Sequence, residues 1–389
     1  MINTRDLSCE AAVVGTGLGG SSFAYGLSRR GFRTIVVDEG ESIQVESADR
    51  APIHYSAFGD KPYVGGLSKF FGASMYRLRE IDFAPTEMEA GVSPGWPISY
   101  LDLEPFYAEA ERLYKVHGSS ENDPTEPPRS GPWPYAPIPH QGPVRELVER
   151  LTTRAKVPVS YIPRSIDYDP GGGGSCVLCR HCDAYFCPRE AKIDSELGAL
   201  RPAIKSGDVT LMPRTTCLRI ITSADGRRVE GIRVKREGEE FTIHARIVAV
   251  SGGVMGTPLL LWRSRNDHHP NGLGNRSGNL GRNFGAHTMG WVFPIKLGVQ
   301  RTPFHQKTFA IHAFYESAPG WPYPTGTIQS AGYIEPIGVS RRYLPFVATL
   351  LKNSFQTFIM SEGLPTSETG FHLSDNGVNL LRAPIQNVK

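Results

Sequence analysis

Three glycines and one aspartate near the start of the chain have the spacing of a nucleotide-binding turn. The stretch from Ala11 to Gly40 reads AAVVGTGLGGSSFAYGLSRRGFRTIVVDEG, with glycines at 15, 17 and 20 and an acid at 38. Glycine lets the backbone turn sharply, lets a pyrophosphate approach main-chain N–H groups, and lets the next helix pack closely on the strand. An acid about 20 residues further on accepts hydrogen bonds from a ribose. We therefore predict that this turn binds a dinucleotide, although the motif alone does not separate FAD from NAD.

The residues around the turn predict the elements that position it. Apolar runs at Ala11–Val14 and Thr34–Val37 predict two strands, and the residues between them predict a helix. The N-terminus of that helix would direct unpaired N–H groups at phosphates.

A second glycine-rich stretch, VGGLSKFFGASMYRLREIDF at residues 64–83, also contains small residues at close spacing. Gly65, Gly66, Ser68, Gly72 and Ala73 would let a flat cofactor approach the backbone. An ordinary turn next to a strand explains the same spacing, and both interpretations stay open.

Four cysteines lie close together in CVLCRHCDAYFCPREAK, at positions 176, 179, 182 and 187. Two CxxC steps and a final Cys-Pro are similar to a bacterial iron–sulfur run, but the last gap has four residues instead of three and no second cluster motif exists. Four thiolates would also fit zinc. Buried or mildly redox-active thiols in a loop are the third reading and the one that we expect, with no bound metal. We expect His181 to be exposed or structural.

The rest of the chain alternates predicted helices and strands. Asp102 is expected to cap a helix with an apolar core-facing stripe, and a second helix is expected from about Val144 to Ala155. Turns at Asp225-Gly226 and Glu237-Gly238 predict an antiparallel meander. The apolar run Ile247–Val250 then predicts a buried strand. The stripe consists of Leu103, Phe106, Tyr107, Ala110, Leu113 and Tyr114.

Composition limits the class of protein. The 389 residues contain 40% hydrophobic and 21% charged residues with a net charge of +3, as in a globular protein that does not bind nucleic acid. The N-terminal MINTRDLSCE leaves no room for a secretory signal, and the apolar stretch at 344–351 is too short to span a membrane. We therefore expect a cytoplasmic location without a membrane span.

Taken together, these stretches resemble the GMC (glucose–methanol–choline) oxidoreductases, a family of FAD-dependent alcohol oxidases and dehydrogenases. The resemblance covers nearly the whole chain and depends on a series of motifs in order: GTGLGG with Asp38, VGGLSKFFGASMYRLREIDF, WPISYLDLEPFYAEAERLY, VSGGVMGTPLLL and GLGNRSGNLGRNFGAH. DPTEPPRS, CDAYFCPREAKIDSE and FHQKTFAIHAFYE resemble one bacterial branch of the family, related to sugar and polyol oxidoreductases.

The resemblance implies that FAD lies along the first glycine turn. It places the adenosine ribose at Asp38, the adenine at the backbone of Cys217, and the isoalloxazine beside residues 72–75. The implied reaction is oxidation of a CH–OH group of a sugar-like or polyol alcohol, with hydride passing to FAD and then to oxygen or another acceptor. The implied cofactor-binding residues are Gly15, Thr16, Gly17, Leu18, Gly19, Gly20, Asp38, Glu39, Gly65, Gly66, Ser68, Gly72, Ala73, Cys217, Ser251 and Gly252.

No stretch of the chain matches the late family segment that carries the catalytic histidine, so no catalytic residue is carried over. One alternative is a catalytically incomplete FAD-binding fragment or half of a split enzyme, whose partner chain supplies that segment. Another is an iron–sulfur electron-transfer subunit that uses the four clustered cysteines. An NAD-dependent dehydrogenase leaves the later glycine motifs unexplained. The histidines expected to be structural are His287, His305, His312 and His372.

The predicted fold class is α/β (α+β): a Rossmann-like FAD/NAD(P)-binding domain and a substrate domain with a mostly antiparallel sheet. Residues 1–100 and 195–289 are assigned to the first domain, and residues 101–194 and 290–389 to the second.

Overall fold

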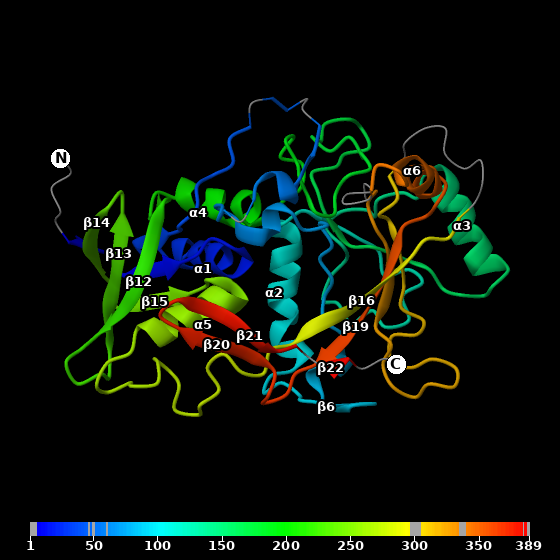
Figure 1. Cartoon of the computed structure of the whole chain (residues 1–389). Coiled ribbons are helices and arrows are strands. Elements are labelled where there is room, and N and C mark those ends of the chain that lie inside the picture. The colour runs from blue at the N-terminus through cyan, green and yellow to red at the C-terminus, as the bar shows by residue number, and fades with distance from the viewer. Residues whose placement is uncertain are drawn as a thin grey trace.

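A four-stranded parallel sheet forms the centre of the half of the molecule that contains the first glycine turn (Figure 1). Its order is β11-β3-β2-β15, and the helix α1 (Leu18–Ser28) connects β2 to β3 as the sequence predicts. Buried Val13 and Val36 pack with Ala24 of α1 on one face of this sheet. The bounds are β2 (Ala11–Val14), β3 (Thr34–Val37), β11 (Val209–Met212) and β15 (Ile247–Val250), with α4 (Arg201–Lys205) and α5 (Gly253–Arg263).

This computed structural model describes residues 6–45, 47–48, 51–59, 61–295, 305–333, 340–383 and 385–386. Met1 to Arg5, on which part of the cytoplasmic expectation rests, and Phe304 of the FHQKTFAIHAFYE motif lie outside these residues.

An antiparallel meander packs on the other face of the parallel sheet. It consists of β12 (Thr215–Thr222), β13 (Val229–Arg236) and β14 (Glu239–His244), and β1 (Leu7–Ser8) pairs with β14 in parallel. Glu237 and Gly238 form the two-residue turn between β13 and β14, both with positive φ, as the sequence predicts. Buried Ile232 and Ile243 of the meander share a core with Leu260 of α5.

The other half of the molecule contains a six-stranded sheet whose pairings are antiparallel. Its strands are β8 (Ser160–Tyr161), β16 (Ala286–Val292), β17 (Phe309–Ile311), β18 (Thr327–Ser330), β19 (Thr357–Leu364) and β22 (Ile385–Gln386). The helix α3 (Gly142–Thr153) packs Val144 against Phe309 of β17, and α6 (Leu344–Lys352) lies at the same end (Figure 1). The predicted fold class is therefore confirmed, while the domain boundaries stay a prediction.

The helix α2 (Tyr100–Leu113) crosses the centre of the molecule between the two halves (Figure 1). Ser99, not Asp102, is its N-cap; Asp102 acts from the third helical position and accepts from the Ser99 N–H. The predicted apolar stripe is wrong in part, because Phe106 is 64% exposed while Glu104 and Glu111 are buried. The buried guanidinium of Arg77 binds both carboxylates, which is why the helix turns this face inward.

Short pairs of strands and single helical turns connect these elements. The hairpin of β20 (Gly370–Ser374) and β21 (Gly377–Arg382) crosses α5, as Figure 1 shows. None of the helices in the described ranges has the length and apolar character needed to span a bilayer. The remaining bounds are β4 (Ile53–His54), β5 (Thr86–Met88), β6 (Gly91–Ser93), β7 (Val116–His117), β9 (Arg164–Ser165) and β10 (Tyr185–Phe186), with short helical turns at Tyr55–Ala57, Gly66–Lys69, Glu80–Phe83 and Glu196–Leu200.

Candidate functional site

The first glycine turn contains two kinds of glycine. Gly15 has φ +94°, and a Cβ there would collide with the carbonyl group of Ser251, while a Cβ at Gly20 would collide with the carbonyl oxygen of Gly15. The fold itself therefore requires these two glycines. Gly17, in contrast, has an ordinary φ of −62° and nothing within 4 Å of its Cβ position. The space in front of Gly17 is open, at the N-terminus of α1.

Asp38 directly follows β3, and its carboxylate stabilises the glycine turn. One carboxylate oxygen accepts hydrogen bonds from the N–H of Thr16 at 2.9 Å and from its hydroxyl group at 2.5 Å; the other accepts from the N–H of Gly40 at 2.8 Å. Burial raises the pKa of Asp38, and these hydrogen bonds oppose the rise. The structure thus assigns Asp38 a part in shaping the turn, and its contact with a ribose stays a prediction.

The second glycine segment lies directly against the first. The N–H of Gly65 donates to the Thr16 hydroxyl at 2.9 Å, and the Cβ position of Gly66 is 3.6 Å from the Cα of Gly17. Ser68 donates its hydroxyl to the carbonyl oxygen of Gly65 at 2.6 Å. Residues 65–68 therefore lie beside the glycine turn, while their predicted place near a pyrophosphate stays a prediction.

Ser195 and Lys69, for which the sequence predicts no role, stabilise the junction of these two segments. The hydroxyl of Ser195 lies 2.8 Å from the carbonyl oxygen of Thr16 and 3.1 Å from that of Gly65. Buried Lys69 forms an ion pair with Asp194 at 3.1 Å and another with Glu196. Neither residue has a distinct sequence signal, because their partners are more than 100 residues away in the chain.

Ser251 and Gly252 also lie beside the turn, whereas Cys217 lies on β12, and its contact with a cofactor stays a prediction. The N–H of Ser251 donates to the carbonyl oxygen of Val14, and Gly252 is the N-cap of α5. Cys217 follows Thr215, whose N–H donates to the carbonyl oxygen of Asp38 at 2.8 Å. Burial raises the pKa of the Cys217 thiol to about 12.

Gly72 and Ala73 pack elsewhere. A Cβ at Gly72 would collide with the ion pair between Asp183 and Lys307, and the carbonyl oxygen of Ala73 accepts from Ser165. Glu39 is exposed. Their roles beside a cofactor stay predictions.

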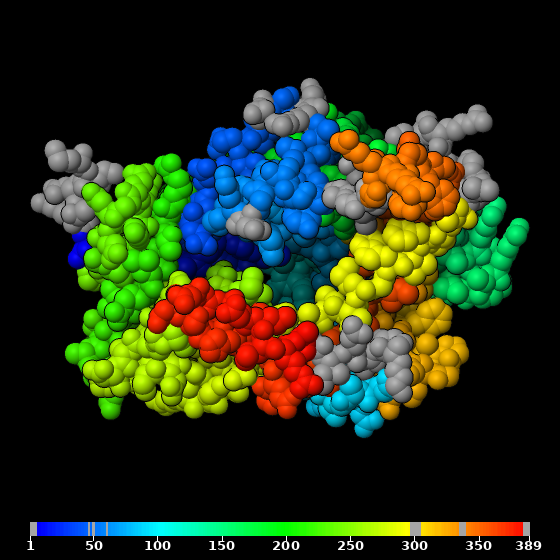
Figure 2. Space-filling view, viewed as in Figure 1, coloured from blue at the N-terminus to red at the C-terminus, as the bar shows by residue number. Residues whose placement is uncertain are grey.

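Exposed apolar side chains lie in segments that border a hollow on one face of the molecule. They come from four segments: the start of α1, the second glycine segment, the start of α5, and β16 with the residue after it. Figure 2 shows this face hollowed between the blue N-terminal segments and the yellow β16, above the red hairpin, with α2 behind. Such a recess suits a flat ring system. The side chains are Leu18, Leu67, Val254, Met255, Met289, Trp291 and Phe293.

The predicted structural role of two histidines agrees with their contacts. Nδ1 of His305 donates to the carbonyl oxygen of Cys179 at 2.8 Å, and burial lowers its pKa to about 3. His312 lies 2.8 Å from a carboxylate oxygen of Asp123 in a buried cluster with Arg79. His287 and His372 are exposed on β16 and β20.

The cysteine loop is described in full, and no three of its side chains converge as metal ligands with each other or with the described histidines and carboxylates. This part of the structure therefore gives the iron–sulfur and zinc alternatives no ligand set.

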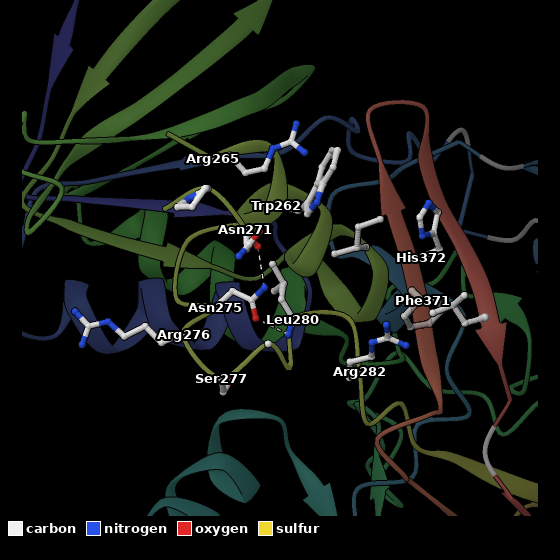
Figure 3. Close-up of a pocket in the computed structure, with 14 residues that line it drawn as sticks. Trp262, Arg265, Asn271, Asn275, Arg276, Ser277, Leu280, Arg282, Phe371 and His372 are labelled. Carbon is white, nitrogen blue, oxygen red and sulfur yellow. Dashed lines mark hydrogen bonds between the residues drawn. The ribbon is translucent and has the colours of Figure 1, made fainter. Parts of the chain in front are cut away.

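A separate pocket of about 570 Å³ lies between the loop after α5 and the β20–β21 hairpin. Figure 3 shows that Arg265, Arg276 and Arg282 around it do not point toward one another. Arg265 stacks on Trp262 and binds Asp375 instead. These residues do not form a shared anion site, and the pocket is not lined by the glycine turn.

Parts of the chain match known protein families. Residues 141–289 match the family described as GMC oxidoreductase, and residues 13–59 match an NAD(P)-binding Rossmann-like domain. The 6'''-hydroxyparomomycin C oxidase of Streptomyces lividus is 28% identical over 301 residues, 72% of this chain and 54% of that protein. The fructose dehydrogenase large subunit of Gluconobacter japonicus is 26% identical over 331 residues, 74% of this chain and 60% of that protein.

Among solved structures, the pyridoxine 4-oxidase from Mesorbium loti matches with a TM-score of 0.61 at 13% identity, over 96% of this chain and 76% of that chain. This likeness concerns the fold. The chain spans little more than half the length of the curated relatives described above.

Proposed function

The chain belongs to the GMC oxidoreductase family, and we propose that it binds FAD and oxidises a CH–OH group of a sugar-like or polyol alcohol. The single observation that carries the proposal is the glycine turn itself. Gly15 and Gly20 are required by packing, whereas Gly17 faces open space where a pyrophosphate would approach.

The described residues fit the dinucleotide. The first turn of α1 contains no acidic residue, so no carboxylate there repels a phosphate, and its N–H groups have no partners within the helix. Gly66 and Ser251 would border the phosphates, and the apolar recess would hold the flavin. When bound, FAD supplies the electron chemistry by accepting the hydride.

The substrate class is supported by the relatives. One is named a fructose dehydrogenase large subunit and another a 6'''-hydroxyparomomycin C oxidase. Both names concern those proteins, and the resemblance of this chain to them favours a hydroxylated, sugar-like substrate.

The reaction also needs a base that takes the hydroxyl proton. His305 and His312 are occupied in buried networks, so neither is placed to do this. This favours a second candidate function: an FAD-binding chain that does not oxidise alcohols unaided and receives its base from a partner chain. Without a base we expect oxidation to be about 10²- to 10⁴-fold slower.

The visible spectrum of the chain, recorded without oxygen, tests both candidates. The chain is loaded with FAD and then given fructose, other sugars and polyols. Bleaching of the oxidised flavin bands by one substrate class supports the first function. Flavin bands that persist with every substrate contradict it and support the second, and a chain that takes up no flavin contradicts both.

A further inference from the structure

Three buried cations gather around the cysteine loop. The side chain of Arg164 is fully buried, and Lys192 and Lys307 are buried beside it. Lys307 forms an ion pair with Asp183, which is the only carboxylate paired with these three cations among the described residues. Lys192 donates instead to the carbonyl oxygens of Phe71, Cys182 and Tyr185. The cluster therefore holds more positive than negative charge.

The sulfur of Cys182 lies within this cationic cluster. Nη2 of Arg164 donates to it at 3.2 Å, and Nε of Arg164 has no hydrogen-bond partner among the described groups although it is buried. Buried charges need compensation, and cationic neighbours stabilise the nucleophilic thiolate form of a cysteine. Cys182 is half-buried, so a small oxidant can reach it.

Cys179 is tied to the same cluster through His305. Nη1 of Arg164 lies 3.2 Å from Nε2 of His305, and Nδ1 of His305 donates to the carbonyl oxygen of Cys179 at 2.8 Å. The two cysteines also form a CxxC step, the spacing of redox-active thiol pairs. Burial, with a contribution from the neighbouring Cys182, raises the pKa of the Cys179 thiol to about 11, so Cys179 stays protonated at neutral pH.

We propose that Cys182 reacts with peroxide through its thiolate form and then forms a disulfide with Cys179. In the first step, the Cys182 sulfur attacks hydrogen peroxide: the O–O bond breaks, an S–O bond forms, and hydroxide leaves with the sulfur oxidised by two electrons. In the second step, the Cys179 thiol loses its proton and attacks the Cys182 sulfur. The S–S bond forms, and the sulfenic oxygen leaves as water.

Arg164 and Lys192 have the role of positioning and charge compensation. Both contact Cys182, one at the sulfur and one at the carbonyl oxygen.

The experiment uses the full chain, fully reduced and freed of reductant, with hydrogen peroxide added from outside. It needs no flavin, so its outcome is independent of the proposed function. The remaining thiols are alkylated at successive times and counted at each cysteine by mass spectrometry. We expect Cys182 to be lost at least about tenfold faster than Cys217, followed by a peptide that joins Cys179 to Cys182. If the free thiol of Cys182 disappears no faster than the free thiol of Cys217, the proposal is overturned.

Four single variants separate the roles. Cys179→Ser is expected to stop the reaction at the sulfenic acid, which dimedone traps, and Cys182→Ser is expected to abolish the fast phase. Cys187→Ser is the matched control and is expected to react like the unmodified chain. A fast phase that disappears with Cys187→Ser, or a disulfide from Cys182 to Cys176 or Cys187, would refute the assigned pair. Arg164→Lys keeps the charge but loses the fork of donors, and is expected to slow the fast phase while the thiol count at Cys217 is unchanged.

Discussion

The carboxylate of Asp38 accepts hydrogen bonds from both the N–H and the hydroxyl group of Thr16, and that hydroxyl accepts in turn from the N–H of Gly65. These contacts connect the end of β3, the first glycine turn and the second glycine segment. Three stretches that lie far apart in the sequence are thereby held in one arrangement before any cofactor binds. Such preorganisation reduces the entropy that binding must overcome.

Replacing Asp38 by alanine is expected to destabilise the chain. The substitution leaves the buried N–H groups of Thr16 and Gly40 without their acceptor, which costs about 1 to 3 kcal/mol in the free energy of unfolding. Urea unfolding of Asp38→Ala measures this change, with exposed Glu41→Ala as the control. Equal unfolding midpoints for the two variants would show that Asp38 does not hold the turn.

Two glycines of the same turn are expected to respond differently to alanine. Gly20→Ala places a Cβ against the carbonyl oxygen of Gly15, so we expect both a lower melting temperature and loss of FAD binding. Gly17→Ala meets no protein atom and has a compatible φ, so the apo chain should keep its melting temperature while FAD binding weakens. If Gly17→Ala binds FAD as tightly as the unmodified chain, the space in front of Gly17 is not the pyrophosphate site.

Removal of Arg77 is expected to be strongly destabilising. Its guanidinium pairs with Glu104 at 2.9 Å and with Glu111 at 2.8 Å. Without Arg77, Glu111 keeps Arg129 as a partner, but Glu104 keeps no cationic partner among the described residues, and breaking buried ion pairs costs about 3 kcal/mol or more. Arg77→Ala should therefore unfold at much lower urea than Arg112→Ala, which removes an exposed arginine from α2. Similar midpoints would mean that the buried ion pair does not position α2.

Stability should fall as the pH falls below about 6.5. Burial, together with the charge of Arg164, lowers the pKa of His305 to about 3, whereas the unfolded chain binds that proton with a pKa near 6.5. Below pH 6.5 the unfolded state therefore binds more protons, and between pH 6.5 and pH 5 this histidine alone costs about 2 kcal/mol.

The measurement is urea unfolding at both pH values for the unmodified chain, for His305→Gln and for His268→Gln. His305→Gln should show a smaller pH dependence, and exposed His268→Gln should show the original one. An unchanged pH dependence in His305→Gln would mean that His305 is not the buried neutral histidine that titrates.

The sequence was sufficient for elements whose signal is local. The glycine turn between β2 and α1 is determined by close backbone contacts, and the Glu237-Gly238 turn by the positive φ that both residues adopt. Both predictions are confirmed for that reason. The fold class and the family follow from the same local signals taken in order.

Contacts between distant residues were not predictable in this way. The periodicity of α2 placed Phe106 in the core, but the carboxylates of Glu104 and Glu111 lie inward because Arg77 meets them. The roles of Ser195 and Lys69 were not predictable for the same reason, because contacts between residues far apart in the chain leave no periodic pattern in the sequence. The sequence suggested a metal site, a cluster or redox-active thiols for the cysteine loop, and only its surroundings show that Arg164 faces Cys182.

The most direct test of the central claim, that the glycine turn of this chain binds FAD, is a titration of the purified apo chain with FAD, followed by flavin fluorescence and by the melting temperature. The account predicts saturable binding of one FAD per chain with a rise in melting temperature, no comparable rise with NAD, and loss of the effect in Gly20→Ala. The account would be contradicted if the apo chain binds no FAD. It would also be contradicted if the Gly20→Ala variant binds FAD as tightly as the unmodified chain.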